Sequence, residues 1–485
     1  MRFKRVALVN PPYSPKIFPI PVILPGLGYL AQSLRQAGAE VKVLDANLGK
    51  DHPKIVNELA EFDPDMVGIS MISYRFRSHG ALISSIRERL PEVTLAAGGP
   101  HVSSVREEAL KQFPELDYAF FLDGEQSLAQ LAEGKPEKEI PGLIYRNGSE
   151  SGVSSNPAQL PKDLDSIPWP RYDDFELDRY GYGMSIVTSR GCPYSCIYCS
   201  CNVIGKTYRG RSPESVRDEV DYWYRRGYRE FGLQEDNPTF DKGRMHAICD
   251  ELIRADFKDA VFQAGNGVRA DRVDKELLEH MYRAGFRRLA FGIESASDKV
   301  LKAMRKGTTL KIEDEAVRMA CEAGFFVSLF FLIGTPKETL EDVEMSCKFA
   351  LKYPVKDVSF YNLVPMPSTE LWSYIDKNDL WVRKPEEYLN SPLFPMHSTH
   401  PVFVTPELGI EDRRKALKRG WQIRAEVTRR AVAGQLQRFG ILGRALAWVY
   451  SRNKVRAFEN SLLAKPWYRA SVGKLRSKVR ALFYK

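Results

Sequence analysis

The sequence has no hydrophobic run long enough to cross a membrane as a helix. Its longest largely apolar stretch, residues 325–333, is well short of the roughly 18 residues that indicate a span. The basic start at residues 1–5 is followed by only four apolar residues before Asn10, so no secretory signal is expected. Internal repeats and low-complexity tracts are also absent. With 44% hydrophobic and 27% charged residues, the composition predicts a globular cytoplasmic protein of about three domains.

Cysteine is scarce and unevenly placed. The chain has seven cysteines, and four of them lie between positions 192 and 201. A disulfide framework would spread its cysteines, so this clustering indicates metal binding in a reducing compartment. Cys192, Cys196 and Cys199 have the spacing C-x3-C-x2-C, which can supply three thiolates to one face of a [4Fe–4S] cluster. A zinc site completed by Cys201 is the alternative.

The first part of the chain, residues 1–135, alternates short apolar strands with helical segments. This alternation predicts a doubly wound, Rossmann-like α/β domain with a parallel sheet. The strands are expected at residues 6–10, 41–44, 66–70, 94–98 and 118–122. Residues 136–182 are rich in proline and are expected to be a linker, with a short strand at 143–145.

The same alternation restarts at about residue 183 and continues to 375. Six strand–helix units predict a partial (β/α)6 barrel, in which functional residues lie on the loops after the strands. The strands are expected at residues 185–188, 231–234, 262–266, 288–293, 327–333 and 358–363. Residues 376–485 are expected to form a C-terminal cap, which is mostly helical and basic.

The cysteine motif on the loop after the first barrel strand, with Tyr198 before the third cysteine, resembles that of the radical S-adenosylmethionine (SAM) superfamily. The resemblance implies that Cys192, Cys196 and Cys199 ligate a [4Fe–4S] cluster whose free iron chelates SAM. An electron from the cluster then cleaves SAM to a 5′-deoxyadenosyl radical. The following strand ends match the SAM-binding loops of the family in order: Glu235 or Asp236 for the methionine amine, Asn266 and Arg269 for ribose and carboxylate, Glu294 and Ser295 for the ribose hydroxyls, and Gly334 for the adenine side.

A doubly wound domain in front of such a barrel resembles the cobalamin-binding members of the superfamily. The cobalamin motif Asp-x-His-x-x-Gly is absent, because Asn47 stands where histidine would be. The resemblance then implies that the dimethylbenzimidazole tail lies near Ser70, Gly98 and Gly99. His101 is interpreted as a polar loop residue rather than a cobalt ligand, and a domain that binds no corrin is the alternative.

The resemblance covers about residues 1–375 and implies a cobalamin-dependent radical SAM enzyme. Methylation of an unactivated carbon, in a hydrophobic small molecule or lipid, is the favoured reaction. Flavodoxin or ferredoxin is the expected type of reductant. The alternatives are an oxidative cyclase or ring-rearranging enzyme with the same cofactors, a methylthiotransferase-like RNA modifier, and a non-enzymatic corrin-sensing protein.

The net charge of +9 is concentrated near the C-terminus. Residues 401–485 contain 20 Lys and Arg against 5 Asp and Glu, so the remainder of the chain is slightly acidic. Tryptophan, phenylalanine and leucine are interleaved with these basic residues. We interpret residues 411–485 either as a peripheral contact with the inner membrane surface or as an ordinary helical cap with a cationic surface. No nucleic-acid-binding signature is present, and no nucleic-acid partner is expected.

Overall fold

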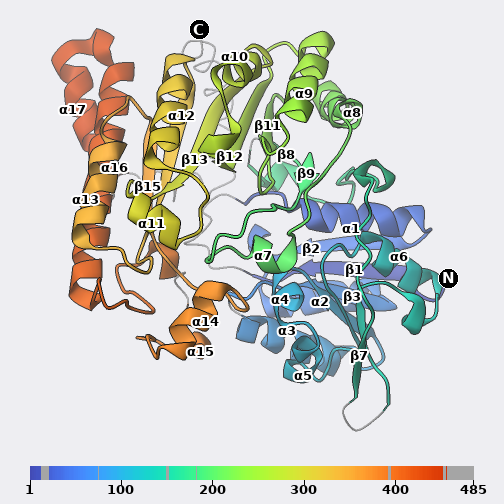
Figure 1. The fold of residues 1–485 in the computed structure, drawn as a ribbon. Coiled ribbons are helices and arrows are strands. Elements are labelled where there is room, and N and C mark those ends of the chain that lie inside the picture. Colours follow the sequence, from blue (N-terminus) through green and yellow to red (C-terminus); the bar gives the residue numbers. More distant parts are fainter. Residues whose placement is uncertain are drawn as a thin grey trace.

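The computed structural model describes residues 1–12, 21–74, 76–148, 152–181, 183–391 and 395–451, together with Val455 and Leu462. An N-terminal α/β domain, blue to teal in Figure 1, lies beside a larger barrel domain, green to orange. The cysteine-bearing loop and helix α7 (Cys201–Ile204) lie between the two. None of the helices in these ranges is long and apolar enough to cross a bilayer.

The N-terminal domain contains a seven-stranded sheet with the order β2-β1-β3-β4-β5-β6-β7, in which the first five strands are parallel. In β1, Val6 and Leu8 point to one core while Ala7 and Val9 point to the other. This two-sided burial requires helices on both faces, and it confirms the doubly wound fold. The strands are β1 (Arg5–Asn10), β2 (Glu40–Asp45), β3 (Met66–Ser70), β4 (Thr94–Gly98), β5 (Tyr118–Phe120), β6 (Leu143–Arg146) and β7 (Val153–Ser155).

Helices α1 and α6 contribute to the core on one face of this sheet, and α2 and α3 contribute to the other. Proline lies in the first turn of α1, α2 and α4, and α2 also has a side-chain cap. The carboxylate of Asp51 accepts from the backbone NH of Lys54 at the start of α2. The helices of this domain are α1 (Pro25–Gln36), α2 (His52–Phe62), α3 (Phe76–Arg89), α4 (Pro100–Val105), α5 (Glu108–Gln112) and α6 (Glu125–Glu133).

The barrel domain has six parallel strands in the order β15-β14-β13-β12-β11-β8, and the two outer strands do not pair with each other. The sheet is therefore an open, partial barrel, as predicted. The strands are β8 (Met184–Ile186), β11 (Glu230–Leu233), β12 (Val261–Val268), β13 (Phe286–Glu294), β14 (Phe326–Ile333) and β15 (Asp357–Asn362). The outer helices are α8 (Pro213–Arg225), α9 (Lys242–Ala255), α10 (Lys275–Arg283), α11 (Asp298–Ala303), α12 (Leu310–Glu322) and α13 (Leu340–Ala350).

Five of the six barrel strands end at a different residue from the one predicted, β11 and β15 each one residue earlier. β8 ends at Ile186, because the chain turns there into the short ribbon of β9 (Ser189–Arg190) and β10 (Arg209–Gly210). β12 continues to Val268 across a register shift, which places Asn266 within the strand. β13 continues to Glu294, whose backbone is left-handed with φ of 66°.

The proline-rich segment that follows the first domain is packed against both domains. Its residues 143–146 and 153–155 add two antiparallel strands to the first sheet, and the short strand expected at 143–145 is among them. Tyr172 packs against Trp223 of the barrel, and the Tyr180 hydroxyl donates to Asp45 Oδ2 at 2.7 Å. The segment therefore joins the first sheet to the barrel.

The C-terminal region closes the side of the barrel beside β15. Helix α16 (Ile410–Gln435) packs on β15 and α13, and α17 (Gly440–Tyr450) folds back against α16 (Figure 1, left). The preceding segment contains α14 (Glu370–Lys377) and α15 (Pro385–Tyr388) and also reaches the N-terminal domain, where Tyr74 donates to the Ser391 carbonyl. The expected helical tail beyond residue 451 lies outside the described residues, apart from Val455 and Leu462.

Candidate active site

The three motif cysteines lie on the loop between β9 and α7, where α7 contacts α4 of the N-terminal domain. Cys196 is buried, whereas Cys192 and Cys199 are partly exposed. Main-chain hydrogen bonds hold the loop in place. The Cys192 NH donates to the Gly205 carbonyl (2.8 Å), and the Ile197 NH donates to the Met304 carbonyl (3.1 Å).

The donor set of this loop fits an iron–sulfur cluster. Burial raises the pKa of the Cys192 and Cys196 thiols, so a bound cation is needed to hold them as thiolates. In the described ranges, no three His, Cys, Asp or Glu side chains are close enough to share a single metal ion. A cubane binds its thiolates through different irons and therefore spaces them more widely. The Cys201 thiol hydrogen-bonds to Cys199 and Asp236.

A buried lysine holds Glu294, the predicted ribose ligand. Lys306 Nζ donates to Glu294 Oε1 (3.1 Å) and to the Gly292 carbonyl (2.6 Å). Tyr198 hydrogen-bonds to the same carboxylate. The carboxylate of Glu294 is therefore held from two sides, by Lys306 and by Tyr198, and Tyr198 directly follows the buried Cys196–Ile197 segment in the chain. The sequence alone assigned Lys306 no role.

Arg269 and Asn266, the candidates on the third barrel loop, are engaged differently. The Arg269 guanidinium is buried, donates to Asp271 Oδ1 (2.8 Å) and the Lys306 carbonyl (2.7 Å), and lies over the ring of Tyr194. The Arg269 guanidinium therefore holds the backbone at Lys306 beside the cysteine loop. Asn266 is exposed and donates to Gln234 Oε1 at 3.0 Å.

The structure separates the two acidic candidates on the second barrel loop. Glu235 is buried and accepts from the hydroxyls of Thr188 and Ser189. Burial raises its pKa. Asp236 is exposed beside the cysteine loop and accepts from the Gly191 NH at 3.2 Å. Asp236 is therefore the carboxylate that can reach a ligand ammonium, while Glu235 fixes the start of β9.

Ser295 and Gly334 lie at the ends of β13 and β14. Ser295 is fully buried, and its hydroxyl has no hydrogen-bond partner in the described structure. The Gly334 NH donates to Glu338 at 2.6 Å. Gly334 has φ of 108°, and a Cβ there would collide with the guanidinium of Arg413. Arg413 comes from α16, and no sequence signal connected it to this loop.

Ser70, Gly98 and Gly99 line a cavity of about 410 Å³ at the carboxyl edge of the first sheet. Its walls are mostly apolar and include Leu8, Leu27, Ala96 and Phe120, while Val187 and Arg190 reach it from the barrel. Gly99 has φ of 99°, and its backbone lies against Met71 too closely for a side chain. An apolar cavity with exposed backbone fits an aromatic ligand group such as a corrin's benzimidazole tail.

Asp45, at the end of β2, and His101, in α4, are outside the lining of this cavity and are hydrogen-bonded within the protein. Asp45 accepts from Asn10 (2.7 Å), the Asn47 NH (2.9 Å) and Tyr180. His101 is buried, with its Nδ1 at 3.1 Å from Ser73 Oγ and its Nε2 at 3.4 Å from Gln112. Both ring nitrogens of His101 are thus engaged within the protein.

Two family models match the chain. The model described as the radical SAM superfamily matches residues 186–350, and the model described as the B12 binding domain matches residues 22–132. The first range runs from the last residue of β8 through β14 and includes the cysteine loop. The second covers most of the domain that contains the apolar cavity.

Curated relatives match most of the chain. An uncharacterized methyltransferase, PH0819 of Pyrococcus horikoshii, is 31% identical over 78% of this chain and 85% of its own. The anaerobic magnesium-protoporphyrin IX monomethyl ester cyclase of Cereibacter sphaeroides is 27% identical over 71% of this chain and 59% of its own. The cytidylyl-2-hydroxyethylphosphonate methyltransferase of Streptomyces wedmorensis is 28% identical over 76% of this chain and 81% of its own.

A solved structure has the same fold. The radical SAM methyltransferase TsrM of Kitasatospora setae, determined with cobalamin and a [4Fe–4S] cluster bound, superposes with a TM-score of 0.69. The match covers 93% of this chain and 99% of that one, at 22% sequence identity.

Proposed function

The chain belongs to the radical SAM enzymes that carry a B12-binding domain, and we propose that it methylates an unactivated carbon of a hydrophobic small molecule or lipid. Its cofactors are a [4Fe–4S] cluster, SAM and cobalamin. As a radical SAM enzyme it uses a reductant and acts on a small molecule. One observation carries the proposal: the cysteine loop and the apolar 410 Å³ cavity both lie at the junction between the two domains, since α7 contacts α4 and Val187 and Arg190 line the cavity.

When bound, the cluster and cobalamin supply the electron and the methyl group, and the side chains of this protein position the reactants. Cys192, Cys196 and Cys199 would hold the cluster. Asp236 would bind the ammonium of SAM, and Glu294, fixed by Tyr198 and Lys306, would accept from the ribose hydroxyls. Asn266 and Arg269 would meet the ribose and the carboxylate of SAM, Ser295 would assist Glu294 at the ribose hydroxyls, and Gly334 would lie on the adenine side.

The C-terminal segment would keep water out of the reaction site. Tyr388 and Phe403 are fully buried in one apolar cluster with Ile197 of the cysteine loop. The Leu371 NH donates to the Ile197 carbonyl at 2.9 Å. A dry, apolar surround suits a hydrophobic substrate, and it protects a reactive radical from side reactions.

The experiment is anaerobic incubation of cobalamin-loaded enzyme with CD3-labelled SAM, a one-electron reductant of the flavodoxin or ferredoxin type, and an isoprenoid lipid extract. Each turnover consumes two SAM and two electrons. It should give one S-adenosylhomocysteine, one 5′-deoxyadenosine and one methionine per CD3-bearing product. The Cys196→Ala variant should give no 5′-deoxyadenosine. A wild-type enzyme that forms 5′-deoxyadenosine but transfers no label to any lipid would contradict the methylation proposal.

An oxidative cyclase is the second candidate, because the Cereibacter cyclase is 27% identical over 71% of this chain. A tetrapyrrole in the same assay separates the two activities. A cyclase would release 5′-deoxyadenosine and change the mass of the tetrapyrrole without incorporating the CD3 group. Incorporation of the label supports methylation instead.

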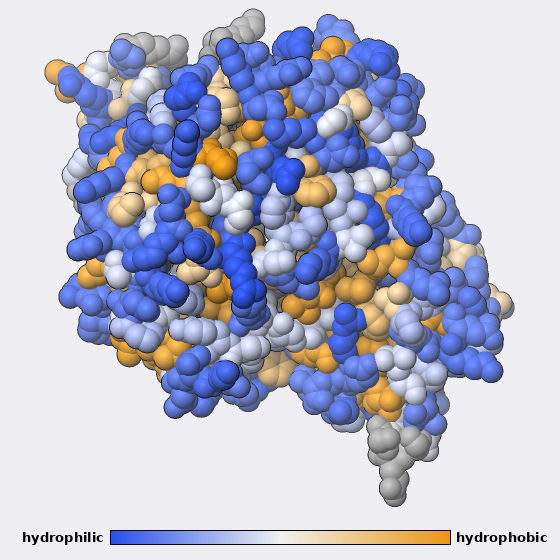
Figure 2. Space-filling view, in the orientation of Figure 1, coloured by the Kyte–Doolittle hydropathy of each residue, from blue (hydrophilic) through white to orange (hydrophobic). Residues whose placement is uncertain are grey.

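We also propose that α17 rests on an anionic lipid surface, at the cytoplasmic face of the membrane. Its exposed side chains include Ile441 (76% exposed), Leu442 (73%) and Leu446 (57%). Hydrophobic atoms reach the surface at the upper left of Figure 2, where Figure 1 places α17. The excess of Lys and Arg after residue 400 is complementary to anionic headgroups.

Vesicle flotation tests this contact. The enzyme should float with phosphatidylglycerol vesicles but not with phosphatidylcholine vesicles, and Leu442→Glu should abolish flotation. Ile253→Glu is the matched control, because Ile253 is an exposed apolar residue on α9, far along the chain from α17. Failure of the wild type to float with either vesicle would leave α17 as part of an ordinary helical cap and contradict the proposal.

A further inference from the structure

A cluster of charged side chains joins the apolar cavity to the cysteine loop. Arg190, at the end of β9, pairs with Glu125 at 2.7 Å and with Asp123 at 3.3 Å. Its guanidinium carbon lies 4.8 Å from the centre of the Tyr29 ring. All four residues line the cavity. The wall facing any occupant of the cavity thus includes a side chain that belongs to the barrel domain.

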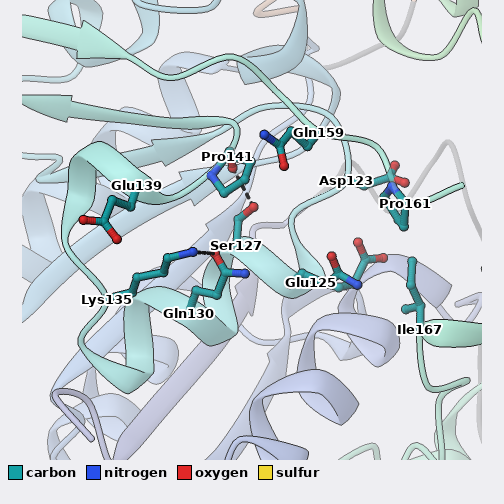
Figure 3. A pocket seen from close by; sticks show the side chains of 11 residues that line it. Asp123, Glu125, Ser127, Gln130, Lys135, Glu139, Pro141, Gln159, Pro161 and Ile167 are labelled. Carbon is teal, nitrogen blue, oxygen red and sulfur yellow. Dashed lines mark hydrogen bonds between the residues drawn. The ribbon is translucent and has the colours of Figure 1, made fainter.

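The two carboxylates of this cluster stand between two hollows. Figure 3 shows Asp123 and Glu125 from the side of a second, polar pocket of about 290 Å³, which they also line. Arg209 on β10 pairs with Asp123 at 2.6 Å, and β10 pairs with β9. The acidic side chains of this cluster therefore lie on the N-terminal domain, and its basic side chains lie on the barrel domain. The cluster is only partly exposed: the side chains of Arg190, Asp123 and Glu125 are 17%, 16% and 8% exposed. Ion pairs with so little exposure are weakly screened by salt.

The chain between Arg190 and Cys192 has little freedom to move. Gly191 has φ of 85°, and a Cβ there would collide with the Thr207 carbonyl oxygen. Its NH donates to Asp236, and the next NH, of Cys192, donates to the Gly205 carbonyl. A displacement of Arg190 is therefore passed on to Cys192 rather than absorbed by the intervening residue.

We propose that this charge cluster couples binding in the apolar cavity to the geometry of the cysteine loop, with Arg190 as the positioning residue. The inference rests on the proposed function and on the expected place of the corrin's nucleotide tail near Ser70, Gly98 and Gly99, which line the cavity. A bound tail contacts Arg190 directly and fixes its guanidinium against Asp123 and Glu125. An assembled [4Fe–4S] cluster fixes the position of Arg190 from the other side, through the cysteine loop. Each ligand therefore pre-organises the site of the other.

Equilibrium binding of hydroxocobalamin tests this coupling without any turnover. We expect cluster-loaded wild-type enzyme to bind it at least about fivefold more tightly than cluster-free enzyme. Glu125→Gln keeps the shape of the side chain but removes its charge, and it should bring the two dissociation constants within about twofold. Arg190→Lys should act in the same direction, because lysine lacks the planar fork that spans both carboxylates. Glu251→Gln, which removes an ion pair with Arg217 between α8 and α9, is the matched control and should keep the wild-type ratio.

The electron paramagnetic resonance spectrum of the reduced cluster provides a second readout. Adding cob(II)alamin, with the reductant in excess so that the cluster stays reduced, should shift the cluster signal in wild type and in Glu251→Gln, but not in Glu125→Gln. Equal affinities of cluster-loaded and cluster-free wild-type enzyme for hydroxocobalamin would overturn the inference and leave the proposed function standing. The wild-type ratio of the two dissociation constants in both Glu125→Gln and Arg190→Lys would do the same. Wild-type enzyme that binds no corrin in either form would overturn both.

Discussion

Replacing Gly334 by alanine should destabilise the junction between the barrel and the C-terminal helix. Gly334 has φ of 108°, where a non-glycine residue costs about 1–3 kcal/mol. The new Cβ would also displace Arg413, which donates to the carbonyls of Phe403 (2.9 Å) and Leu363 (2.7 Å). Loss of one hydrogen bond from a charged group costs about 1.5–3 kcal/mol. We therefore expect Gly334→Ala to lower the free energy of unfolding by about 3–5 kcal/mol.

Denaturant unfolding followed by circular dichroism measures this loss. Gly434→Ala is the matched control: Gly434 lies in α16, has no neighbour against its missing Cβ, and should tolerate alanine or gain up to about 1 kcal/mol of helix propensity. In the double variant Gly334→Ala/Arg413→Ala the collision is absent. Its loss of unfolding free energy should therefore be smaller than the sum of the losses in the two single variants. The reasoning is refuted if Gly334→Ala costs under about 1 kcal/mol, or if the two losses are strictly additive.

Four further substitutions test the site and its surroundings. Cys192→Ala should abolish the broad visible absorption of the cluster after anaerobic reconstitution and reduce iron content, whereas persistence of both would remove Cys192 from the ligand set. Asp236→Asn should raise the Kd for SAM about tenfold, since a charge-assisted bond is worth about 1.5–3 kcal/mol. Glu235→Gln should leave the Kd for SAM near the wild-type value and should instead lower the free energy of unfolding, because Glu235 fixes the start of β9. Burial raises the pKa of Glu313 from 4.5 to about 8, so its contribution to stability is lost as the pH rises through about 8. Glu313→Gln should therefore be more stable than wild type at pH 9 and equally stable at pH 4, and parallel pH profiles of unfolding would contradict this.

Local patterns in the sequence were sufficient for the arrangement of the fold. Short apolar runs separated by helical spacing predicted the five parallel strands of the first domain and the six of the barrel, because strands buried on both faces must be apolar throughout. The C-x3-C-x2-C spacing likewise located the cysteine loop. These features depend on residues that are close in the sequence, and each has a characteristic spacing.

The directions of side chains at the strand ends could not be predicted in this way. Glu235 and Asp236 are adjacent and chemically alike, yet one is enclosed by Thr188 and Ser189 while the other is exposed. The strand limits at Val268 and Glu294 depended on pairing with neighbouring strands. Only the folded neighbours decide which carboxylate is free.

The sequence by itself therefore determined the two α/β domains, their order and the loop that carries the cysteines. The tertiary structure decided which groups support that loop. Lys306 reaches Glu294 across a helix, Arg413 meets Gly334 from a helix about 80 residues later, and Arg190 meets Glu125 across the domain junction. Hydrophobic spacing is a local property of the chain. Ion pairs and steric contacts between distant segments follow no regular spacing along the sequence, because they form only once the domains have packed together.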